Sequence, residues 1–532
     1  MNFNKVKDLP LEIPEYVNER FSFNYCVSQL GNKELKLRIH KNFIIYAESR
    51  GFYSFEQIQK KNDNFEKTLD NPLDIIENKV KTIFKMTVAH LYRKVDLGEM
   101  KVAIGGNVSS DGLGDYFQML FISSLLKEKV PSLVTMVHTN LGQRGINLTK
   151  PDECGIDLIC INEEDYEQKK VESHLKSADF VLSIPHGKLP SHSSQKHLFI
   201  DEYGMEGASR KLGLGLIHGT DMGIAIKQPL RNSNLANIAH TSLREHLLEI
   251  NNPFFVSYLK DKNRYGFIGE AHRVAFIIMA LASCPEGISK VDIITTFSKL
   301  ERKLFDPDVL NELNVGKIQL FKMDKENNKL ILHEELILNE KEGKIVRIFD
   351  PFPLINADLM LLMKESNSLI GCTGDLSFSE VISHDKLPLY QTMGHKESFF
   401  KDITYITGVL HPEKFPHLHQ FFENTHSLFS LPKKDLEKID VFSRKSLEIG
   451  RDCQNPLLID ESKLFCAKIQ KQYSSNEILV DYLMRKLSHL KHPNLKSAEK
   501  EILTKLLNGN DETLINACKN LKEIIEPYNQ II

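Results

Sequence analysis

Short apolar runs alternate with helix-like stretches along most of this 532-residue chain, and this alternation limits the possible folds more than any other feature. The run Lys101-Val-Ala-Ile-Gly105 has the pattern of a buried strand, and residues 116–128 have the spacing of an amphipathic helix. A second strand pattern follows at 133–138. Strand, helix and strand in this order are typical of a parallel sheet covered by helices, so the sequence predicts an α/β fold.

The same alternation begins again near Asn251 and continues to about residue 390. We therefore predict two Rossmann-like parallel-sheet domains that face a cleft, with helical additions at both ends of the chain. The predicted regions are a helical N-terminal region at 1–97, a first Rossmann-like domain at 98–249, a second at 250–429, and a helical C-terminal region at 430–532.

Charge and hydropathy argue against several classes of partner. The formal net charge is −3 at pH 7, so we expect no overall attraction to nucleic acid. The longest apolar run, Val274–Ala282, is well short of the roughly 20 residues that a membrane-spanning helix needs, so we expect no membrane span. Eight dispersed cysteines without a CxxC pair predict reduced thiols in a cytosol-like compartment.

The start of the sequence lacks the basic-then-apolar layout of a secretory signal. We therefore expect a cytoplasmic protein, or a bacterial effector that is delivered into a host cytosol without a cleavable signal.

The first candidate for chemistry is the glycine-rich stretch 105–115, between the first strand pattern and the helix that follows it. Gly112 and Gly114 permit the close approach of a ligand, and a helix start supplies unpaired N–H groups and a positive dipole end. Asp111 and Asp115 supply carboxylates. The stretch matches neither GxGxxG nor the GK[ST] of a P-loop. The alternative is a tight turn in which Asp115 merely caps a helix.

The second candidate is the stretch 366–383, where a short strand pattern runs into a glycine-rich loop and a helix is predicted to begin near Ser377. A pyrophosphate would meet backbone N–H groups and hydroxyls there, and a carboxylate one helical turn further could reach sugar or ribose hydroxyls. The candidate donor-binding residues are Gly371, Thr373, Gly374, Asp375, Ser377, Ser379 and Glu380. The alternative is a helix capping box formed by Ser377 and Glu380.

Together, these two loops resemble those of GT-B glycosyltransferases, in which an acceptor-side Rossmann-like domain precedes a donor-side one. The stretch Asp111-Gly-Leu-Gly-Asp115 is similar to the first-loop motif Gly-Leu-Gly-Asp of glycogen and starch synthases. The stretch Gly374-Asp-Leu-Ser-Phe378 is distantly similar to the nucleotide-sugar loop of bacterial arginine rhamnosyltransferases that modify an elongation factor. The likeness in layout covers residues 98–405, and the likeness in detail covers only these two motifs.

The resemblance implies that Asp115, or its neighbour Asp111, is the base at the acceptor and that the second loop binds a nucleotide-diphosphate sugar. Many retaining GT-B enzymes carry Glu-x7-Glu near the donor, but here Cys372 stands eight residues before Glu380. This departure favours inverting transfer, in which a carboxylate removes the acceptor proton. No DxD-type metal motif stands at the end of a strand pattern, so we expect neither a metal nor a cofactor besides the nucleotide sugar.

Weaker candidates lie elsewhere in the chain. Glu202 and His218 could serve as an alternative base or as acceptor contacts, although an isolated histidine is more often structural. Arg347 could face a phosphate, or it could lie on a solvated strand face. The chain has no G-x-S-x-G, no HExxH and no Cys/His cluster at zinc spacing, so serine hydrolases and zinc enzymes lack support.

The sequence thus predicts a glycosyltransferase that moves a sugar from a nucleotide-diphosphate sugar to an acceptor. A protein is one option for this acceptor, because so much of the chain lies outside the two predicted sheets. Two alternatives stay open. The chain could be a nucleotide hydrolase or nucleotide-modifying enzyme that uses the same phosphate loops, or a non-catalytic scaffold with a GT-B-like fold.

Overall fold

A computed structural model describes the chain at residues 84–85, 88–107, 114–130, 134–140, 157–161, 177–183, 196–201, 212–213, 215–216, 223–227, 233–248, 252–259, 267–324, 326–338, 343–392, 397–430, 439–508 and 514–529. Among the helices in these ranges, none has the length and apolar character needed to cross a membrane.

The described residues fall into two compact units. The first comprises the chain up to Ile224 together with the segment from Lys471 onward, and the second comprises Ala225–Gln470. This division differs from the predicted regions in two places. Residues 225–249 group with the second unit, and the predicted C-terminal helical region is shared between the two units. The arrangement of two domains around a common cleft stays a prediction.

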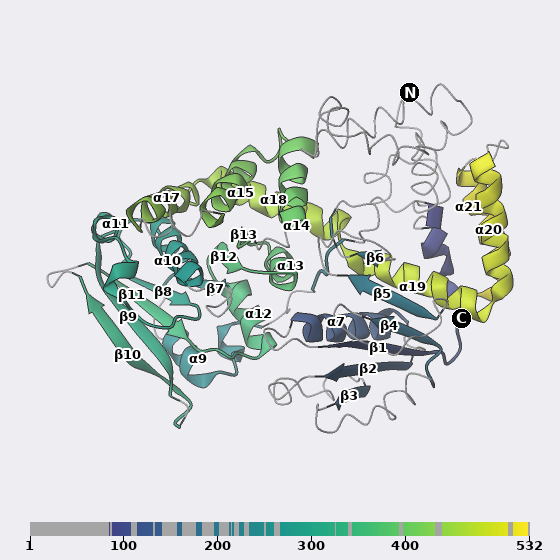
Figure 1. Ribbon diagram of the computed structural model, residues 1–532, viewed down its shortest axis with the longest axis horizontal. Coiled ribbons are helices and arrows are strands. Elements are labelled where there is room, and N and C mark those ends of the chain that lie inside the picture. Colours follow the sequence, from purple (N-terminus) through teal and green to yellow (C-terminus); the bar gives the residue numbers. More distant parts are fainter. Residues whose placement is uncertain are drawn as a thin grey trace, which may run out of the picture. The chain divides into compact units, whose positions relative to one another are not determined.

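The first unit contains a six-stranded sheet in the order β3-β2-β1-β4-β5-β6 (Figure 1). Its strands are β1 Lys101–Asn107, β2 Val134–Asn140, β3 Asp157–Ile161, β4 Phe180–Ser183, β5 His197–Asp201 and β6 Leu212–Gly213. All neighbouring strands are parallel, and α7 (Gly114–Lys129) packs against β1 and β2. The predicted parallel sheet is confirmed, and its strand order is that of a Rossmann fold.

The second unit contains a seven-stranded sheet in the order β10-β9-β11-β8-β7-β12-β13 (Figure 1). Its strands are β7 Phe254–Tyr258, β8 Lys290–Ile294, β9 Val315–Asp324, β10 Lys329–Ile337, β11 Lys344–Asp350, β12 Leu369–Cys372 and β13 Leu387–Tyr390. Only β10 runs antiparallel to its neighbour β9 among these pairs. The second predicted parallel sheet is therefore also confirmed, with an antiparallel edge strand added to it.

Both sheets have a point at which the strand order reverses. In the first sheet the chain builds outward from β1 to β3 and then returns to place β4 on the other side of β1. In the second sheet it builds outward from β7 and later returns to place β12 on the other side of β7. In open α/β sheets, ligands bind at the carboxyl ends of the strands beside such a switch point. The two predicted glycine-rich loops follow β1 and β12, one at each switch point.

The longest apolar run of the sequence, Val274–Ala282, belongs to α10 (Phe267–Ala282), a helix in the core of the second unit. Every residue of this run is at most 4% exposed, and burial of each large side chain stabilises the fold by about 1.5–3 kcal/mol. Helix α17 (Ile439–Asp452) lies along α10 (Figure 1). The contact is close, because a Cβ on Gly450 would lie 2.7 Å from both Ala282 Cβ and Met279 O.

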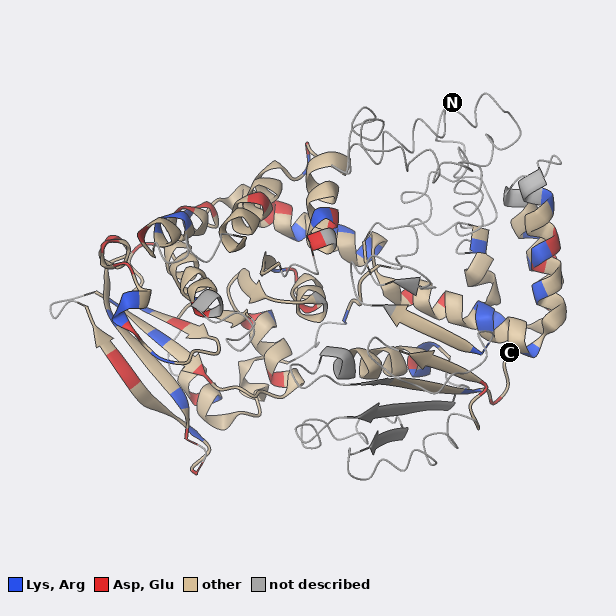
Figure 2. Ribbon diagram, in the orientation of Figure 1, with Lys and Arg blue, Asp and Glu red and all other residues tan. Residues whose placement is uncertain are grey.

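The remaining elements are helical. In the first unit these are η2 His90–Lys94, α19 Ser475–Lys491, α20 Pro493–Asn508, α21 Leu514–Ile525 and η10 Glu526–Tyr528. The others are η6 Leu235–Asn237, α9 Thr241–Leu248, η7 Arg302–Leu304, α11 Pro307–Glu312, α12 Asn356–Glu365, α13 Asp375–Ser383, α14 Glu397–Tyr405, η9 Ile406–Leu410, α15 Pro416–Phe429 and α18 Pro456–Gln472. Basic and acidic residues are interspersed along helices such as α20 (Figure 2).

Candidate functional site

The candidate site lies where β12 ends at the switch point of the second sheet. The chain leaves Cys372, passes Thr373 and enters α13 at Asp375, with Gly374 as the N-cap. Gly374 has φ 85° and ψ 171°, a backbone conformation that is essentially restricted to glycine. A Cβ on Gly374 would meet no atom within 4 Å. The backbone conformation, and not crowding, therefore requires glycine at this position.

The N-terminal end of α13 presents backbone N–H groups. No described side chain caps it, and its first backbone hydrogen bond runs from Phe378 N to Gly374 O at 3.2 Å. The N–H groups of the preceding three residues thus point out of the helix end, where the helix dipole favours negative charge. Ser377 is the third residue of the helix, and its hydroxyl donates to Thr373 O (2.7 Å) and Gly374 O (3.1 Å). The helix begins two residues before the predicted start, and the alternative capping box of Ser377 and Glu380 is wrong.

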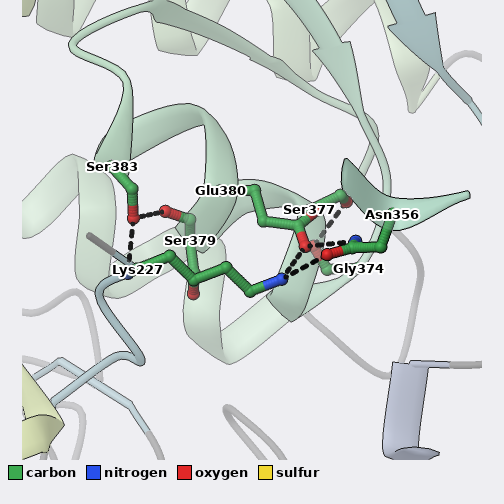
Figure 3. Close-up of polar contacts among 7 residues, drawn as sticks. All are labelled: Lys227, Asn356, Gly374, Ser377, Ser379, Glu380 and Ser383. Atoms are coloured by element: carbon green, nitrogen blue, oxygen red, sulfur yellow. Dashed lines mark hydrogen bonds and ion pairs between the residues drawn. The ribbon is translucent and has the colours of Figure 1, made fainter. Parts of the chain in front are cut away.

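Glu380, in the second turn of α13, is a buried carboxylate held by two side chains (Figure 3). The residue is 3% exposed. Its Oε1 forms an ion pair with Lys227 Nζ and accepts a hydrogen bond from Asn356 Nδ2 at 3.4 Å. Lys227 Nζ also donates to Asn356 Oδ1 at 3.5 Å. Within the part of the chain that the structure describes, the Oε2 of Glu380 accepts no hydrogen bond, which leaves one oxygen for a ligand.

The backbone of Lys227 is fixed to the same helix. Lys227 N donates to Ser383 Oγ at 3.0 Å, and Ser383 Oγ donates to Ser379 O at 2.6 Å (Figure 3). Lys227 is thus bound to α13 through both its main chain and its side chain, so the position of its ammonium group beside Glu380 is well defined.

Thr373 is connected to α10 through two buried side chains. Its hydroxyl donates to Gln391 Oε1, and Gln391 Nε2 donates to His272 Nδ1 at 2.7 Å. Burial lowers the pKa of His272 to about 4, which keeps Nδ1 an acceptor at neutral pH. The His272 ring packs against Phe429 with centroids 4.5 Å apart. This chain of hydrogen bonds fixes the Thr373 side chain and with it the start of the loop.

The predicted donor-binding residues therefore lie together, but not all present a group to a ligand. Gly371 is closely packed, because a Cβ there would lie 2.6 Å from Ser257 Oγ. Ser379 is fully buried, and the hydroxyl protons of Thr373 and Ser377 are engaged within the chain. The backbone at Gly374 and Asp375 and the carboxylate of Glu380 remain the groups best placed for a ligand.

The acceptor-side predictions fall largely outside the described residues. Asp111, Gly112, Glu202 and His218 lie there, so their roles stay predictions. Gly114 and Asp115 are the first two residues of α7, which follows β1 at the switch point of the first sheet and begins two residues before the predicted helix start. The structure describes their backbone only. The described residues contain no group of three or more His, Cys, Asp or Glu side chains that could hold a metal ion.

Arg347 requires a correction. The sequence made it a weak candidate for a phosphate contact or a solvated strand face, but it is 6% exposed and bound within the second sheet. Its Nε and Nη2 donate to the two carboxylate oxygens of Asp292 at 2.7 and 2.6 Å. The two residues are cross-strand partners on β11 and β8, so each buried charge neutralises the other.

Sequence reasoning missed Lys227 and Asn356. Lys227 is 153 positions from Glu380 and lies in no motif, so no local signal marks it. Asn356 is the first residue of α12, and only the fold places its amide beside Glu380.

Comparisons with known proteins do not identify a family for this chain. No known family and no curated protein sequence matches the chain. Among solved structures, one similar chain is described as "alpha-glucosyltransferase in complex with UDP and a 13-mer DNA containing a central A:G mismatch". It is 10% identical, and the match covers 70% of this chain and 98% of that chain with a TM-score of 0.29. A likeness at this TM-score carries no argument about function.

Proposed function

We propose that the second unit binds the diphosphate of a nucleotide sugar at the N-terminus of α13 and that the protein transfers the sugar to an acceptor. The observation that carries the proposal is the pairing of two features at one switch point: the glycine N-cap at Gly374 and the buried carboxylate of Glu380. An uncapped helix end attracts phosphate, and a carboxylate oxygen accepts hydrogen bonds from sugar hydroxyls.

The diphosphate would accept hydrogen bonds from the backbone N–H groups at the start of α13. Because Gly374 has no Cβ, the phosphate oxygens can approach the helix end closely. The fixed backbone dipoles would also stabilise the negative charge that develops on the departing diphosphate.

Glu380 would bind a hydroxyl of the ribose or of the sugar. Its Oε1 is engaged by Lys227 and Asn356, so Oε2 is the acceptor for the ligand. The ion pair also offsets part of the cost of burying the Glu380 carboxylate. Lys227 therefore acts as a positioning residue in this proposal.

In the transfer step, an acceptor nucleophile attacks the anomeric carbon while the bond from that carbon to the diphosphate breaks. A carboxylate takes the proton of the nucleophile, and Asp115 is our candidate for it, with Asp111 as the alternative. Attack from the side opposite the diphosphate inverts the anomeric configuration. We propose that the step needs no metal ion and that the acceptor is a protein.

Calorimetric titration of the full chain with UDP, GDP, TDP, ADP and their sugar conjugates tests the donor site. We expect one diphosphate and its sugar conjugate to bind. Gly374→Ala and Glu380→Gln should each weaken this binding by about tenfold or more, since each removes part of the site. Gly287→Ala is a matched control because Gly287 also has a positive φ, 84°, and open space around it. Glu461→Gln is the matched control for the carboxylate, because Glu461 is also buried (9% exposed) and is bound by His417 and Leu418 instead of residues of the candidate site. If the control variants weakened nucleotide binding as much as Gly374→Ala and Glu380→Gln do, the assignment of the donor site to the start of α13 would be wrong.

Transfer itself is tested with a labelled donor and a cell lysate as the source of acceptor, with and without EDTA. We expect label on protein, unchanged by EDTA and lost in Asp115→Asn or Asp111→Asn. Release of nucleotide without sugar transfer would favour a nucleotide hydrolase. The absence of any nucleotide binding would favour a non-catalytic scaffold.

A further inference from the structure

Tyr258 is an exposed aromatic residue at the candidate site to which the proposed transfer assigns no role. It is the last residue of β7, and in the sheet register it lies opposite Cys372, the last residue of β12. Its side chain therefore stands beside the strand that leads directly into Gly374. Tyr258 is 44% exposed, and it is the only exposed phenylalanine or tyrosine among the residues whose side chains the structure describes. An exposed ring offers a ligand a large, rigid apolar face.

The ring lies on the face of the sheet that α13, the helix of Glu380, covers, because Phe378 of α13 packs against Tyr390, which lies opposite Cys372 in the sheet register. Gly371 and Ser257 share the opposite face, because a Cβ on Gly371 would lie 2.6 Å from Ser257 Oγ. Side chains alternate along a strand, so Tyr258 and Cys372 point the other way. In agreement, after the larger effect of burial, the charge of Glu380 raises the pKa of both Tyr258 and Cys372.

A second ring supports Tyr258 from the neighbouring part of the sheet. Phe352 follows β11, and its ring centroid lies 6.0 Å from that of Tyr258 with the planes at 49°. Such a tilted pair holds the Tyr258 ring in place while part of the ring stays exposed.

We propose that the nucleobase of the ligand stacks on Tyr258 and that the site therefore takes a nucleotide rather than a diphosphate or sugar phosphate alone. This inference rests on the proposed function. In this arrangement one ligand contacts three groups of the site. The N-terminus of α13 binds its diphosphate, the carboxylate of Glu380 binds its ribose, and the ring of Tyr258 stacks on its base. Because every base has an aromatic face, stacking gives affinity but little choice among bases.

The test compares the tightest nucleoside diphosphate with inorganic pyrophosphate by calorimetry on the full chain. Wild-type protein should bind the nucleoside diphosphate about tenfold or more tightly than pyrophosphate. Tyr258→Leu should remove most of this difference and leave pyrophosphate binding unchanged, whereas Tyr258→Phe should keep it. Leu457→Ala, which alters another exposed apolar residue (56% exposed) of the same unit, should change neither affinity.

Equal wild-type affinities for the two ligands would overturn the role of Tyr258 and leave the phosphate site intact. So would a Tyr258→Leu variant that keeps the preference. Failure of the wild-type protein to bind either ligand would instead overturn the proposed function. If Tyr258→Leu does not fold, the wild-type ratio and Tyr258→Phe still decide between these outcomes.

Discussion

Lys227 and Glu380 are 153 positions apart in the sequence and form an ion pair within the second unit. The side chain of Glu380 is 4% exposed and that of Lys227 is 17% exposed, so the pair is largely shielded from water. The main chain of Lys227 is fixed to the same helix through Ser383. Lys227 comes three residues after Ile224, where the chain leaves the first unit. The segment that follows the unit boundary is therefore bound to α13, the helix that begins at the candidate site.

The segment in which the chain returns to the first unit is also bound to α13, near the C-terminal end of the helix. Gln470 is the last residue of the second unit, and its Nε2 donates to Ile382 O at 2.7 Å and to Asp385 Oδ1 at 2.8 Å. The C-terminal end of α13 and the turn after it thus bind the main chain of Lys227 and the side chain of Gln470, and the Lys227 side chain also reaches Glu380 at the candidate site.

A double-mutant cycle measures the Lys227–Glu380 ion pair. Lys227→Met leaves a buried carboxylate without its cation and should lower the free energy of unfolding by about 1–3 kcal/mol. Glu380→Gln removes that charge, so the double variant should be more stable than the sum of the two single effects predicts, by about 0.5–3 kcal/mol. Urea denaturation of the four proteins gives the values. Additive effects would show that the two side chains do not interact in solution.

Gly374→Ala should destabilise the fold through its backbone alone. Alanine at φ 85° and ψ 171° costs about 1–3 kcal/mol, and the open space around Gly374 excludes a steric clash as the cause. The structure of the variant should therefore stay close to that of wild-type protein, with a change confined to the start of α13. Denaturation together with amide exchange of residues 373–380 checks this prediction. An unchanged unfolding free energy would mean that the loop adopts another conformation in solution.

Most strands of both sheets could be predicted because their signals are local. Runs such as that of β1 and β11 combine apolar and β-branched residues over a few positions, and their alternation with helical patterns indicates a parallel sheet. The placement of both glycine-rich loops after strands came from the same pattern. Two edge strands were missed. Strand β6 has only two residues, one of them a glycine, and the exposed sequence of β10, Lys329-Leu-Ile-Leu-His-Glu-Glu-Leu-Ile337, carries charges and lacks a clear alternation.

The partners of the site residues could not be predicted, because they depend on long-range register and packing. Nothing near Arg347 shows that Asp292 lies directly across the sheet, and only the pairing of β11 with β8 brings the two together. Likewise, Lys227 meets Glu380 only after the second sheet and its helices have formed. A sequence can show which residues could act, whereas the fold decides which of them are already engaged.

Removal of one partner of the Arg347–Asp292 pair should lower the free energy of unfolding strongly, whereas replacement of both partners by apolar residues should lower it less. Arg347→Met leaves Asp292, 1% exposed, without its counter-charge and should destabilise the second unit by about 3–5 kcal/mol. Adding Asp292→Leu removes the isolated charge, so the double variant should be the more stable of the two. Thermal and urea denaturation test both. If Arg347→Met leaves the free energy of unfolding unchanged but abolishes nucleotide binding, Arg347 contacts a phosphate and its pairing with Asp292 does not stabilise the fold.

His272 should make stability depend on pH below neutrality. Burial lowers its pKa from 6.5 to about 4, so between these values the unfolded chain binds a proton that the folded chain does not. Stability is therefore fully present above pH 6.5 and falls as the pH drops toward 4, by about 1.4 kcal/mol per pH unit for this one group. His384, whose pKa burial also lowers to about 4, adds a similar slope.

His272→Asn isolates the contribution of His272. An asparagine does not titrate, and its Oδ1 can accept from Gln391 near the position of the histidine Nδ1. The variant should be less stable than wild-type protein at pH 7, because it loses the contact with Phe429, but its stability should fall less steeply between pH 6.5 and 4.5. Urea denaturation across this range measures both slopes, with the exposed His333→Asn as control. A slope equal to that of wild-type protein would show that His272 is not buried in its neutral form, and that the hydrogen bonds from Thr373 to α10 do not persist in solution.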